Sequence, residues 1–295
     1  MSDPLDPPRF AVVEAVERAL AEDLTPLGDI TSALLPPMLD ATAQVVARQP
    51  GVLAGRACAD ETFRQIDVTL SVSWMANDGD DLEMGKAFGE VSGRLGSILT
   101  AERTALNFLG HLSGVATLTR SYVETVAGAG TSTRIWDTRK TTPGLRVLEK
   151  AAVRAGGGTN HRGNLSDWVL LKDNHLALVG ITAAVHDAQR RWPGRTVHVE
   201  CDRIDQVREA TEAGADALLL DNMSPDEVRA AMINAAEVAA AQGRRTPLLE
   251  ASGGISLETV RRYAETGIDC ISIGRITNSA PVLDIGLDID VDGSS

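Results

Sequence analysis

The sequence predicts an α/β fold in which a small N-terminal sheet domain is followed by a parallel α/β barrel. Two observations support this prediction. Short apolar runs that end in polar or Gly residues recur through the second half of the 295-residue chain, and most of them alternate with amphipathic helical stretches. Strands that alternate with helices form right-handed βα units and a parallel sheet. Six or seven such units in about 145 residues favour a barrel, with a doubly wound sheet as the alternative.

The first half of the chain has a different pattern. Residues 9–24 place apolar side chains at helical spacing, and "GDITSALLPP" then ends that spacing with Gly and two prolines. Between residues 41 and 94, β-type runs separated by Gly and Asp turns predict a small sheet with a helix around residues 57–65. A long helical stretch follows, for which Thr100 is a suitable N-cap and Gly114 a potential break.

These patterns set the expected domain boundaries. We expect an N-terminal α/β domain at residues 1–115 and the barrel at residues 116–278. Residues 279–295 are expected to form a C-terminal tail that is partly disordered, beyond about Leu287. A hydrophobic content of 43% over 295 residues is enough to build a sizeable core.

Composition excludes several classes of partner. The net charge of −13 argues against a nucleic-acid surface, which needs a basic face. No apolar run approaches the roughly 18–20 residues of a membrane span, and "MSDPLDPPRF" does not resemble a basic leader. We therefore expect a cytoplasmic protein without a membrane partner. The three cysteines are too few and too widely spaced for a disulfide framework or a zinc site, so we expect core thiols at Cys58, Cys201 and Cys270.

Cationic groups gather at the ends of the early predicted strands. The carboxyl ends of barrel strands and the loops after them build the active site in such folds. The chain has only four lysines, so a lysine at the end of an apolar strand is notable. Each group alone has an ordinary structural explanation, such as a solvated lysine or a hydrogen-bonded histidine. Together they would repel one another unless an anion binds among them. The groups are Arg139, Lys140, His161, Arg162 and Lys172.

Acidic and Gly-rich ends follow on the later strands. Glu200 and Asp221 could cap loops, or they could hold ribose hydroxyls or a Mg²⁺ that carries a diphosphate. "ASGGIS" places backbone N–H groups ahead of a helix that starts near Ser256, an arrangement typical of phosphate sites. The residues alone therefore predict a site where a phosphorylated sugar meets a small polyanionic acid.

Several of these segments resemble one known family. "LTAERTALNFLGHLSGVAT", "DTRKTTPGLR", "AVRAGGGTNHRGNLSDWVLLKDNH", "LLLDN" and "EASGGI" are similar to the quinolinate phosphoribosyltransferases, also called nicotinate-nucleotide pyrophosphorylases. "EDLTPLGDITS" and "GVLAG" resemble that family's N-terminal domain, so the likeness spans nearly the whole chain in order. It implies that the barrel is incomplete, with fewer than eight strands.

The resemblance also implies an activity and an assembly. The activity is transfer of phosphoribosyl from phosphoribosyl pyrophosphate (PRPP) to quinolinate with decarboxylation. The products are nicotinate mononucleotide, diphosphate and CO₂, in de novo NAD synthesis, with Mg²⁺ as the cofactor. The expected assembly is a homodimer with shared active sites, and it stays open whether dimers assemble further into a hexamer.

Roles for individual residues follow from the same resemblance. Quinolinate binding is implied for Arg139, His161, Arg162 and Lys172, with Arg103 contributed by the neighbouring subunit. Catalytic roles are implied for Lys140, Glu200 and Asp221; Lys140 faces the diphosphate, and the two acids lie near ribose and Mg²⁺, directly or indirectly. Phosphate binding is implied for Ser252, Gly253, Gly254 and Gly274.

Two departures from the family pattern affect only loop geometry and packing, namely Asn164 in place of Gly and Cys201 in place of valine. The alternatives are a paralogue that acts on nicotinate or another heteroaromatic acid, a phosphate-binding barrel of the isomerase or indole-glycerol-phosphate type, and a non-catalytic metabolite-binding protein. A monoacid needs fewer cations than this chain supplies, and binding alone would not require the acidic pair and Lys140.

Overall fold

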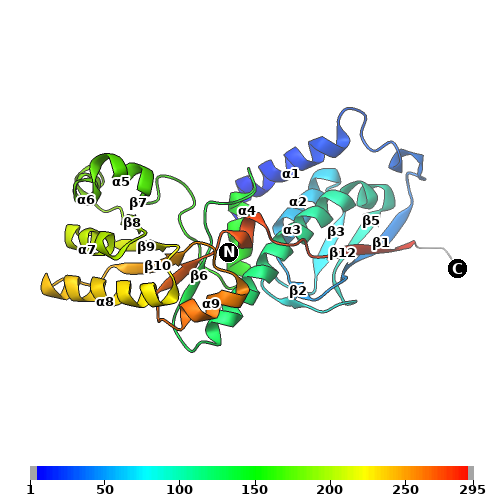
Figure 1. The fold of residues 1–295 in the computed structure, drawn as a ribbon. Coiled ribbons are helices and arrows are strands. Elements are labelled where there is room, and N and C mark those ends of the chain that lie inside the picture. Colours follow the sequence, from blue (N-terminus) through cyan, green and yellow to red (C-terminus); the bar gives the residue numbers. More distant parts are fainter. Residues whose placement is uncertain (1–4, 292–295) are drawn as a thin grey trace. The chain divides into compact units, whose positions relative to one another are not determined.

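A computed structural model describes residues 5–291, which form two compact units (Figure 1). Of the described residues, unit 1 contains 5–120, 140–157 and 275–291, and unit 2 contains 121–139 and 158–274. The expected boundaries at residues 115 and 278 treat each domain as one continuous stretch. The contacts divide the chain differently, because residues 140–157 and the C-terminal segment pack with the N-terminal unit.

Unit 1 is built on a four-stranded antiparallel sheet. Its order is β12-β1-β5-β3, and a separate two-stranded ladder pairs β2 with β4. Burial alternates along β1, so one face of the sheet packs on the core and the other meets solvent. The strands are β1 (Asp40–Ala47), β2 (Gly51–Val52), β3 (Ser71–Trp74), β4 (Asp81–Leu82), β5 (Ala87–Arg94) and β12 (Ile285–Val291).

The last of these strands corrects the expected C-terminal tail. Residues 285–291 pair with β1 as an edge strand, from Ala47 opposite Ile285 to Ala41 opposite Val291. The segment is therefore ordered beyond Leu287. Alternation of Ile285, Leu287 and Ile289 with glycine and aspartates is a strand pattern with one buried face. The expected disorder of residues 292–295 concerns residues outside the described part of the chain.

The helices of unit 1 follow the predicted pattern, with one correction. The expected helices at residues 9–24 and around 57–65 are present, but the long helix starts at Leu95 rather than after Thr100. Thr100 lies inside it, where its hydroxyl donates to the Gly96 carbonyl at 2.8 Å. The helices are α1 (Arg9–Leu24), α2 (Arg56–Ile66), α3 (Leu95–Ala127, of which residues 121–127 belong to unit 2), α4 (Arg146–Ala155) and α10 (Arg275–Asn278), with a 3₁₀ turn η1 (Ser32–Leu34).

Helix α3 runs without a break through Gly114, where a break was expected. Instead, the glycine lets another backbone segment approach the helix closely. A Cβ atom added at Gly114 would lie 2.0 Å from the carbonyl oxygen of Pro281, on the segment that leads into β12. The missing side chain therefore lets backbone pack directly on the helix.

Replacing Gly114 with alanine is expected to lower the free energy of unfolding by about 1–3 kcal/mol, because the added methyl group meets rigid backbone. Gly96 in the same helix is the matched control, since the nearest atom to an added Cβ is 3.8 Å away. There the alanine should stabilise the protein by up to about 1 kcal/mol through helix propensity. Urea denaturation of both variants measures the difference, and equal effects of the two would contradict the packing argument.

Unit 2 is built on a six-stranded parallel sheet of order β6-β11-β10-β9-β8-β7. Successive strands from β7 to β11 are neighbours, and β6 joins beyond β11. A doubly wound sheet would reverse its winding direction, so the order confirms barrel-type winding with fewer than eight strands. The strands are β6 (Arg134–Trp136), β7 (Val169–Leu171), β8 (Val197–Cys201), β9 (Ala217–Asp221), β10 (Leu248–Ser252) and β11 (Cys270–Ser272).

The helices of unit 2 lie between these strands in the chain. Helix α8 begins with a capping box in which the Ser224 hydroxyl accepts from the N–H of Glu227, with Pro225 at the first helical position. Helix α9 has Ser256 as its N-cap, where the sequence predicted it. The helices are α5 (Asp173–Val179), α6 (Ile181–Arg191), α7 (Ile204–Ala213), α8 (Pro225–Ala241) and α9 (Leu257–Ala264).

The three cysteines are buried and unbonded to one another, as expected for core thiols. Burial raises the pKa of Cys58 to about 12 and that of Cys201 to about 12, so neither thiol ionises near neutral pH. Among residues 5–291, no helix combines the length and apolar character that crossing a membrane demands.

Candidate active site

The carboxyl ends of the parallel strands bring the predicted residues of unit 2 to one edge of the sheet. Asp221 at the end of β9 is in register with Ser252 at the end of β10. Leu171 at the end of β7 is in register with Val199, so the next residues, Lys172 and Glu200, lie side by side. Residues that are far apart in the chain therefore meet here, as the strand-end pattern predicted.

Lys172 and Glu200 form an ion pair, with Lys172 Nζ 2.5 Å from Glu200 Oε2. The lysine side chain is about half exposed, whereas the glutamate side chain is largely covered. A lysine was expected for one substrate and an acid for the other. Their contact means that the two predicted halves of the site adjoin.

Asp137, directly after β6, holds the segment that contains His161 and Arg162. Its side chain is fully buried and accepts from the His161 backbone N–H at 2.8 Å and from Asn160 Nδ2 at 2.6 Å. Trp136 also forms an isolated bridge with Thr159. A buried carboxylate that receives two hydrogen bonds fixes the loop against the strand. Asp137 was not among the predicted site residues, although it opens the "DTRK" motif.

Arg162 is buried close to Arg139. Its side chain donates to the Trp168 carbonyl at 3.3 Å and is 7% exposed. Burial, and then the charge of Arg139, lower the pKa of Arg162. The guanidinium remains charged at neutral pH because arginine titrates so far above it. Two neighbouring cations with little water around them create a strong local preference for an anion.

Aromatic rings surround this cationic segment. The His161 ring lies 4.8 Å from the Trp168 ring and 5.6 Å from the Trp136 ring, measured between centroids. The two indoles are 6.3 Å apart. Tilted and edge contacts of this kind hold the imidazole in one orientation. We call the group of Arg139, His161, Arg162 and Lys172 the cationic wall. The indole rings beside it add flat apolar surfaces.

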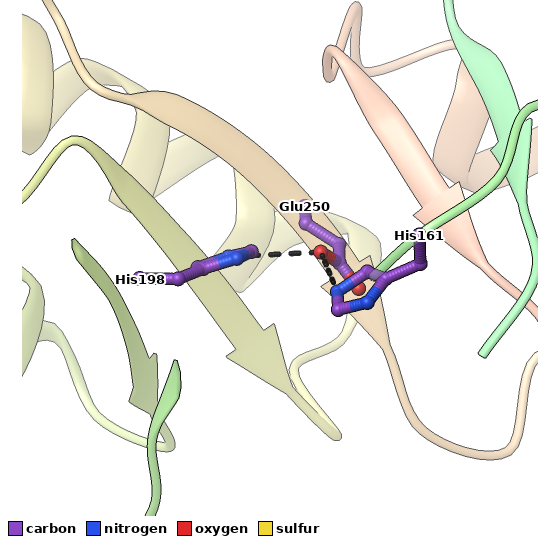
Figure 2. Close-up of side chains that lie close together, drawn as sticks. All are labelled: His161, His198 and Glu250. Atoms are coloured by element: carbon purple, nitrogen blue, oxygen red, sulfur yellow. Dashed lines mark ion pairs between the residues drawn. The ribbon is translucent and has the colours of Figure 1, made fainter. Parts of the chain in front are cut away.

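Behind His161 lies a carboxylate that the sequence patterns did not reveal. Glu250, in the middle of β10, is fully buried, and Figure 2 shows its carboxylate between the rings of His161 and His198. His161 Nε2 is 3.3 Å and His198 Nε2 is 3.6 Å from Glu250 Oε2. Burial would raise the pKa of Glu250, but its contacts with His161, His198 and Ser272 outweigh burial and hold that pKa below its usual range. Burial lowers the pKa of His198 to about 4, so this ring is neutral at pH 7.

The only sequence signals for this cluster were a glutamate inside "LLEAS" and a histidine inside "VHVE". A charged or imidazole side chain within an otherwise apolar barrel strand indicates a buried polar site. Which residues of other strands it meets depends on strand register, which a sequence alone does not supply.

The loops after β9 and β10 form a tight turn around Gly253. Asn222 has a positive φ of 56°, and its N–H donates to the Ser252 carbonyl at 2.9 Å. An added Cβ at Gly253 (φ 99°) would lie 2.2 Å from Asn222 Oδ1. Gly254 (φ 59°) has open space around it and precedes the N-cap of α9 by two residues. Backbone N–H groups are thus presented near a helix N-terminus with no side chain in the way, which suits a phosphate.

Glu200 and Asp221 are the carboxylates that could hold Mg²⁺. They lie on the adjacent strands β8 and β9, and both are partly exposed. Within residues 5–291 they belong to no group of three potential ligands. A Mg²⁺ ion there would take its remaining oxygens from water and a diphosphate. Mg²⁺ commonly binds through one or two carboxylates plus substrate phosphates, so the residues fit the ion.

Two predicted residues belong to unit 1. Arg103 lies exposed on α3. Lys140 is exposed directly after Arg139 in the chain, and its carbonyl accepts from Thr277 Oγ1 at 2.7 Å.

A cavity of about 910 Å³ in unit 2 is lined by Arg134, Asp216 and Leu248 among others. Those residues begin strands or precede them, so the cavity lies at the end of the sheet opposite to the predicted site.

Comparison with known proteins decides the family. The family model described as "Quinolinate phosphoribosyl transferase, N-terminal domain" matches residues 29–113. The model of the family's C-terminal domain matches residues 115–288. The chain belongs to the quinolinate phosphoribosyltransferase family. The resemblance seen in the sequence motifs is therefore confirmed.

Individual relatives agree with this assignment over most of their length. A nicotinate-nucleotide pyrophosphorylase (carboxylating) of Mycobacterium leprae is 41% identical, with 95% of this chain and 97% of that protein covered. A probable enzyme of the same name from Bacillus subtilis is 40% identical, covering 91% and 90%. The nicotinate-nucleotide pyrophosphorylase structure from Francisella tularensis superposes with a TM-score of 0.88 at 37% identity, covering 97% and 98%.

For this member of the quinolinate phosphoribosyltransferases, the predicted fold class is confirmed as well. The structure places Arg139, Arg162, Lys172, Glu200, Asp221, Ser252 and the two following glycines in unit 2, near the carboxyl ends of its strands. Gly274 follows β11 by two residues at the same edge. Asp137, His198 and Glu250 join them as buried polar residues that were not predicted.

Proposed function

We propose that this protein transfers the phosphoribosyl group of PRPP to quinolinate and releases CO₂, forming nicotinate mononucleotide and diphosphate. The proposal rests on the family match and on one feature of the site. The family match covers both domains, and the strand ends of unit 2 gather more cationic groups than a monoacid needs. Quinolinate is a dianion, so a wall with several cations matches its charge.

The cationic wall would bind and orient quinolinate. Arg139 and Arg162 supply guanidinium forks for the carboxylates, and Lys172 can leave Glu200 to contact the substrate. His161 is held by Trp136, Trp168 and Glu250, so its imidazole would meet the substrate in one fixed orientation. Holding the quinolinate ring so that its nitrogen faces ribose C1 accelerates the reaction through positioning.

The other half of the site would hold PRPP. The turn at Ser252, Gly253 and Gly254, with the N-terminus of α9 and Gly274, suits the 5′-phosphate. Lys140 would stabilise the leaving diphosphate. Glu200 and Asp221 would stabilise the positive charge that develops on the ribose, and they are the residues that would hold Mg²⁺, which neutralises diphosphate charge when bound.

Decarboxylation would then need no covalent cofactor from the protein. Attack by the pyridine nitrogen on C1 breaks the bond to diphosphate and leaves that nitrogen positively charged. The bond from ring C2 to its carboxylate breaks, the electron pair stays on C2, and CO₂ departs. The cationic nitrogen stabilises this carbanion until a proton adds at C2. The chain's cations contribute by holding the remaining carboxylate in place.

A direct assay tests the proposal. Purified protein with Mg²⁺ and PRPP should convert quinolinate, but not nicotinate, to nicotinate mononucleotide, with one CO₂ and one diphosphate released per turnover. Preference for nicotinate, without release of CO₂, would instead support the paralogue with another acceptor. Absence of turnover with both acids, in protein shown to be folded by circular dichroism, would contradict the enzyme proposal.

We also propose a cytoplasmic homodimer in which Arg103 of one subunit completes the site of the other. The exposure of Arg103 on α3 leaves its guanidinium available to a partner chain. Sedimentation velocity at assay concentrations should show a dimer. A monomer with full activity would contradict the shared site.

A further inference from the structure

Three buried side chains in unit 2 converge inside the barrel. His161 comes from the loop that Asp137 holds, His198 from β8 and Glu250 from β10. Their relative exposures are 7%, 1% and 0%. Figure 2 shows both imidazoles directed at the same carboxylate. Within residues 5–291, they are the one group of three potential metal-ligating residues whose ligand atoms all lie within 4.8 Å of one another.

The contacts inside this group leave buried polar atoms without hydrogen-bond partners. The His198 ring forms a hydrogen bond with the Leu218 backbone, and Nε2 has no hydrogen-bond partner. The nitrogen that bonds the backbone is therefore Nδ1, and Nε2 lies 3.6 Å from Glu250 Oε2. A buried carboxylate beside a buried ring nitrogen that forms no hydrogen bond with it is unfavourable unless a positive group lies between them.

His161 is not well placed to neutralise the buried Glu250 carboxylate. Its Nε2 is 3.3 Å from Glu250 Oε2, longer than the roughly 2.7–2.9 Å of a good charge-assisted hydrogen bond. Both Glu250 oxygens lack a well-formed hydrogen bond, although the residue is fully buried. The carboxylate is thus held at a distance from both rings, as ligands of one ion are held apart.

We propose that His161, His198 and Glu250 form a binding site for a divalent transition-metal ion, with zinc as the best match. Bonds of about 2.0–2.1 Å in a tetrahedral site put neighbouring ligand atoms about 3.3–3.4 Å apart. The two histidine–glutamate separations are 3.3 Å and 3.6 Å. Two imidazoles and one carboxylate are a usual zinc ligand set, and one position of the tetrahedron stays open.

The surroundings support a metal ligand role for His198 in particular. Histidine ligands of metals characteristically donate their second ring N–H to a carbonyl or carboxylate, as His198 does to Leu218. The ligand set also separates this site from the proposed Mg²⁺ site, because Mg²⁺ prefers oxygen ligands and a nearly octahedral shell. The positive charge of Arg162 opposes a cation here, so the ion should be removable by a chelator.

Cobalt provides the test, because tetrahedral Co²⁺ has intense visible absorption bands that octahedral Co²⁺ lacks. Full-length protein treated with a chelator and dialysed should develop these bands on titration, saturating at one equivalent per chain. Zn²⁺ should abolish the bands at one equivalent, whereas a large excess of Mg²⁺ should not. Zn²⁺ should also raise the Tm of the wild-type protein, since an ion that binds only the folded state stabilises it.

Variants locate the ion. His198→Gln and Glu250→Gln should each abolish the tetrahedral bands and the Zn²⁺-dependent rise in Tm. His111→Gln is the matched control, because His111 Nε2 contacts Glu149 Oε1 at 2.8 Å without a second imidazole. It should bind Co²⁺ like the wild type. If Glu250→Gln fails to fold, His198→Gln alone decides, because it leaves the His161–Glu250 contact intact.

Absence of tetrahedral bands in the wild type, or equal bands in wild type and His198→Gln, would overturn the proposal. The three side chains would then form a metal-free network. None of these readouts depends on phosphoribosyl transfer, so this proposal and the proposed function fail or succeed separately.

Discussion

Replacing Arg162 with alanine should lower kcat/KM for quinolinate by about two to three orders of magnitude. Truncating one member of a buried charge pair typically costs about 2–5 kcal/mol, and Arg162 is the most deeply buried cation of the proposed quinolinate wall. The loss should be larger for quinolinate than for PRPP, whose KM should change little. Steady-state kinetics with each substrate varied in turn measures both effects.

Folding stability should respond differently to the same change. Burial and the charge of Arg139 both disfavour the Arg162 cation, so its removal relieves a repulsion in the substrate-free protein. We expect the Tm of Arg162→Ala to stay near that of the wild type. Arg190→Ala is the control, since Arg190 is exposed on α6 and forms an ion pair with Asp187 on the same helix. Less than a threefold loss of kcat/KM in Arg162→Ala would contradict its place in the site.

Replacing Gly253 with alanine should damage both the fold and the affinity for PRPP. The added Cβ would lie 2.2 Å from Asn222 Oδ1 and 2.8 Å from the Asn222 backbone nitrogen, and the φ of 99° already disfavours a side chain. The turn must move, and with it the backbone N–H groups proposed to bind phosphate. We expect the free energy of unfolding to fall by about 2–4 kcal/mol and KM for PRPP to rise at least tenfold.

Gly243 is the matched control for backbone strain. It has a positive φ of 65°, and nothing lies within 4 Å of an added Cβ. Gly243→Ala should cost only about 1 kcal/mol and leave both KM values unchanged. If Gly253→Ala behaves like Gly243→Ala in urea denaturation and kinetics, the contact with Asn222 does not constrain the turn.

The sequence was sufficient to predict the parallel strands and the residues at their ends. Periodicity and turn residues mark each strand, and the parallel arrangement itself carries every strand end to the same edge. That is why Lys172 and Glu200 could be expected near each other from the strand pattern alone. The residues inside the strands were harder to predict. His198 and Glu250 meet across β9, and that contact depends on register, which local sequence does not specify.

The expected C-terminal tail and the expected N-cap of α3 were wrong for a related reason. Residues 279–295 were expected to form a tail that is disordered beyond about Leu287, yet every second residue of 285–291 is apolar and the segment pairs with β1. Thr100 was expected to cap α3 because threonine favours N-caps, but the helix already begins at Leu95. For residues 285–291, a long-range pairing outweighed the local pattern.

The pairing of β1 with β12 also fixes the order in which the protein can mature during synthesis. Arg48, just after β1, bonds Asp288 in β12, a partner 240 positions later in the chain. A ribosome therefore completes the sheet of unit 1 only when residues 285–291 emerge. Until then β1 keeps an unpaired edge in the nascent chain, and that edge is open to pairing with other chains. The sheet that begins with β1 is thus completed only after all the strands of unit 2 have been made.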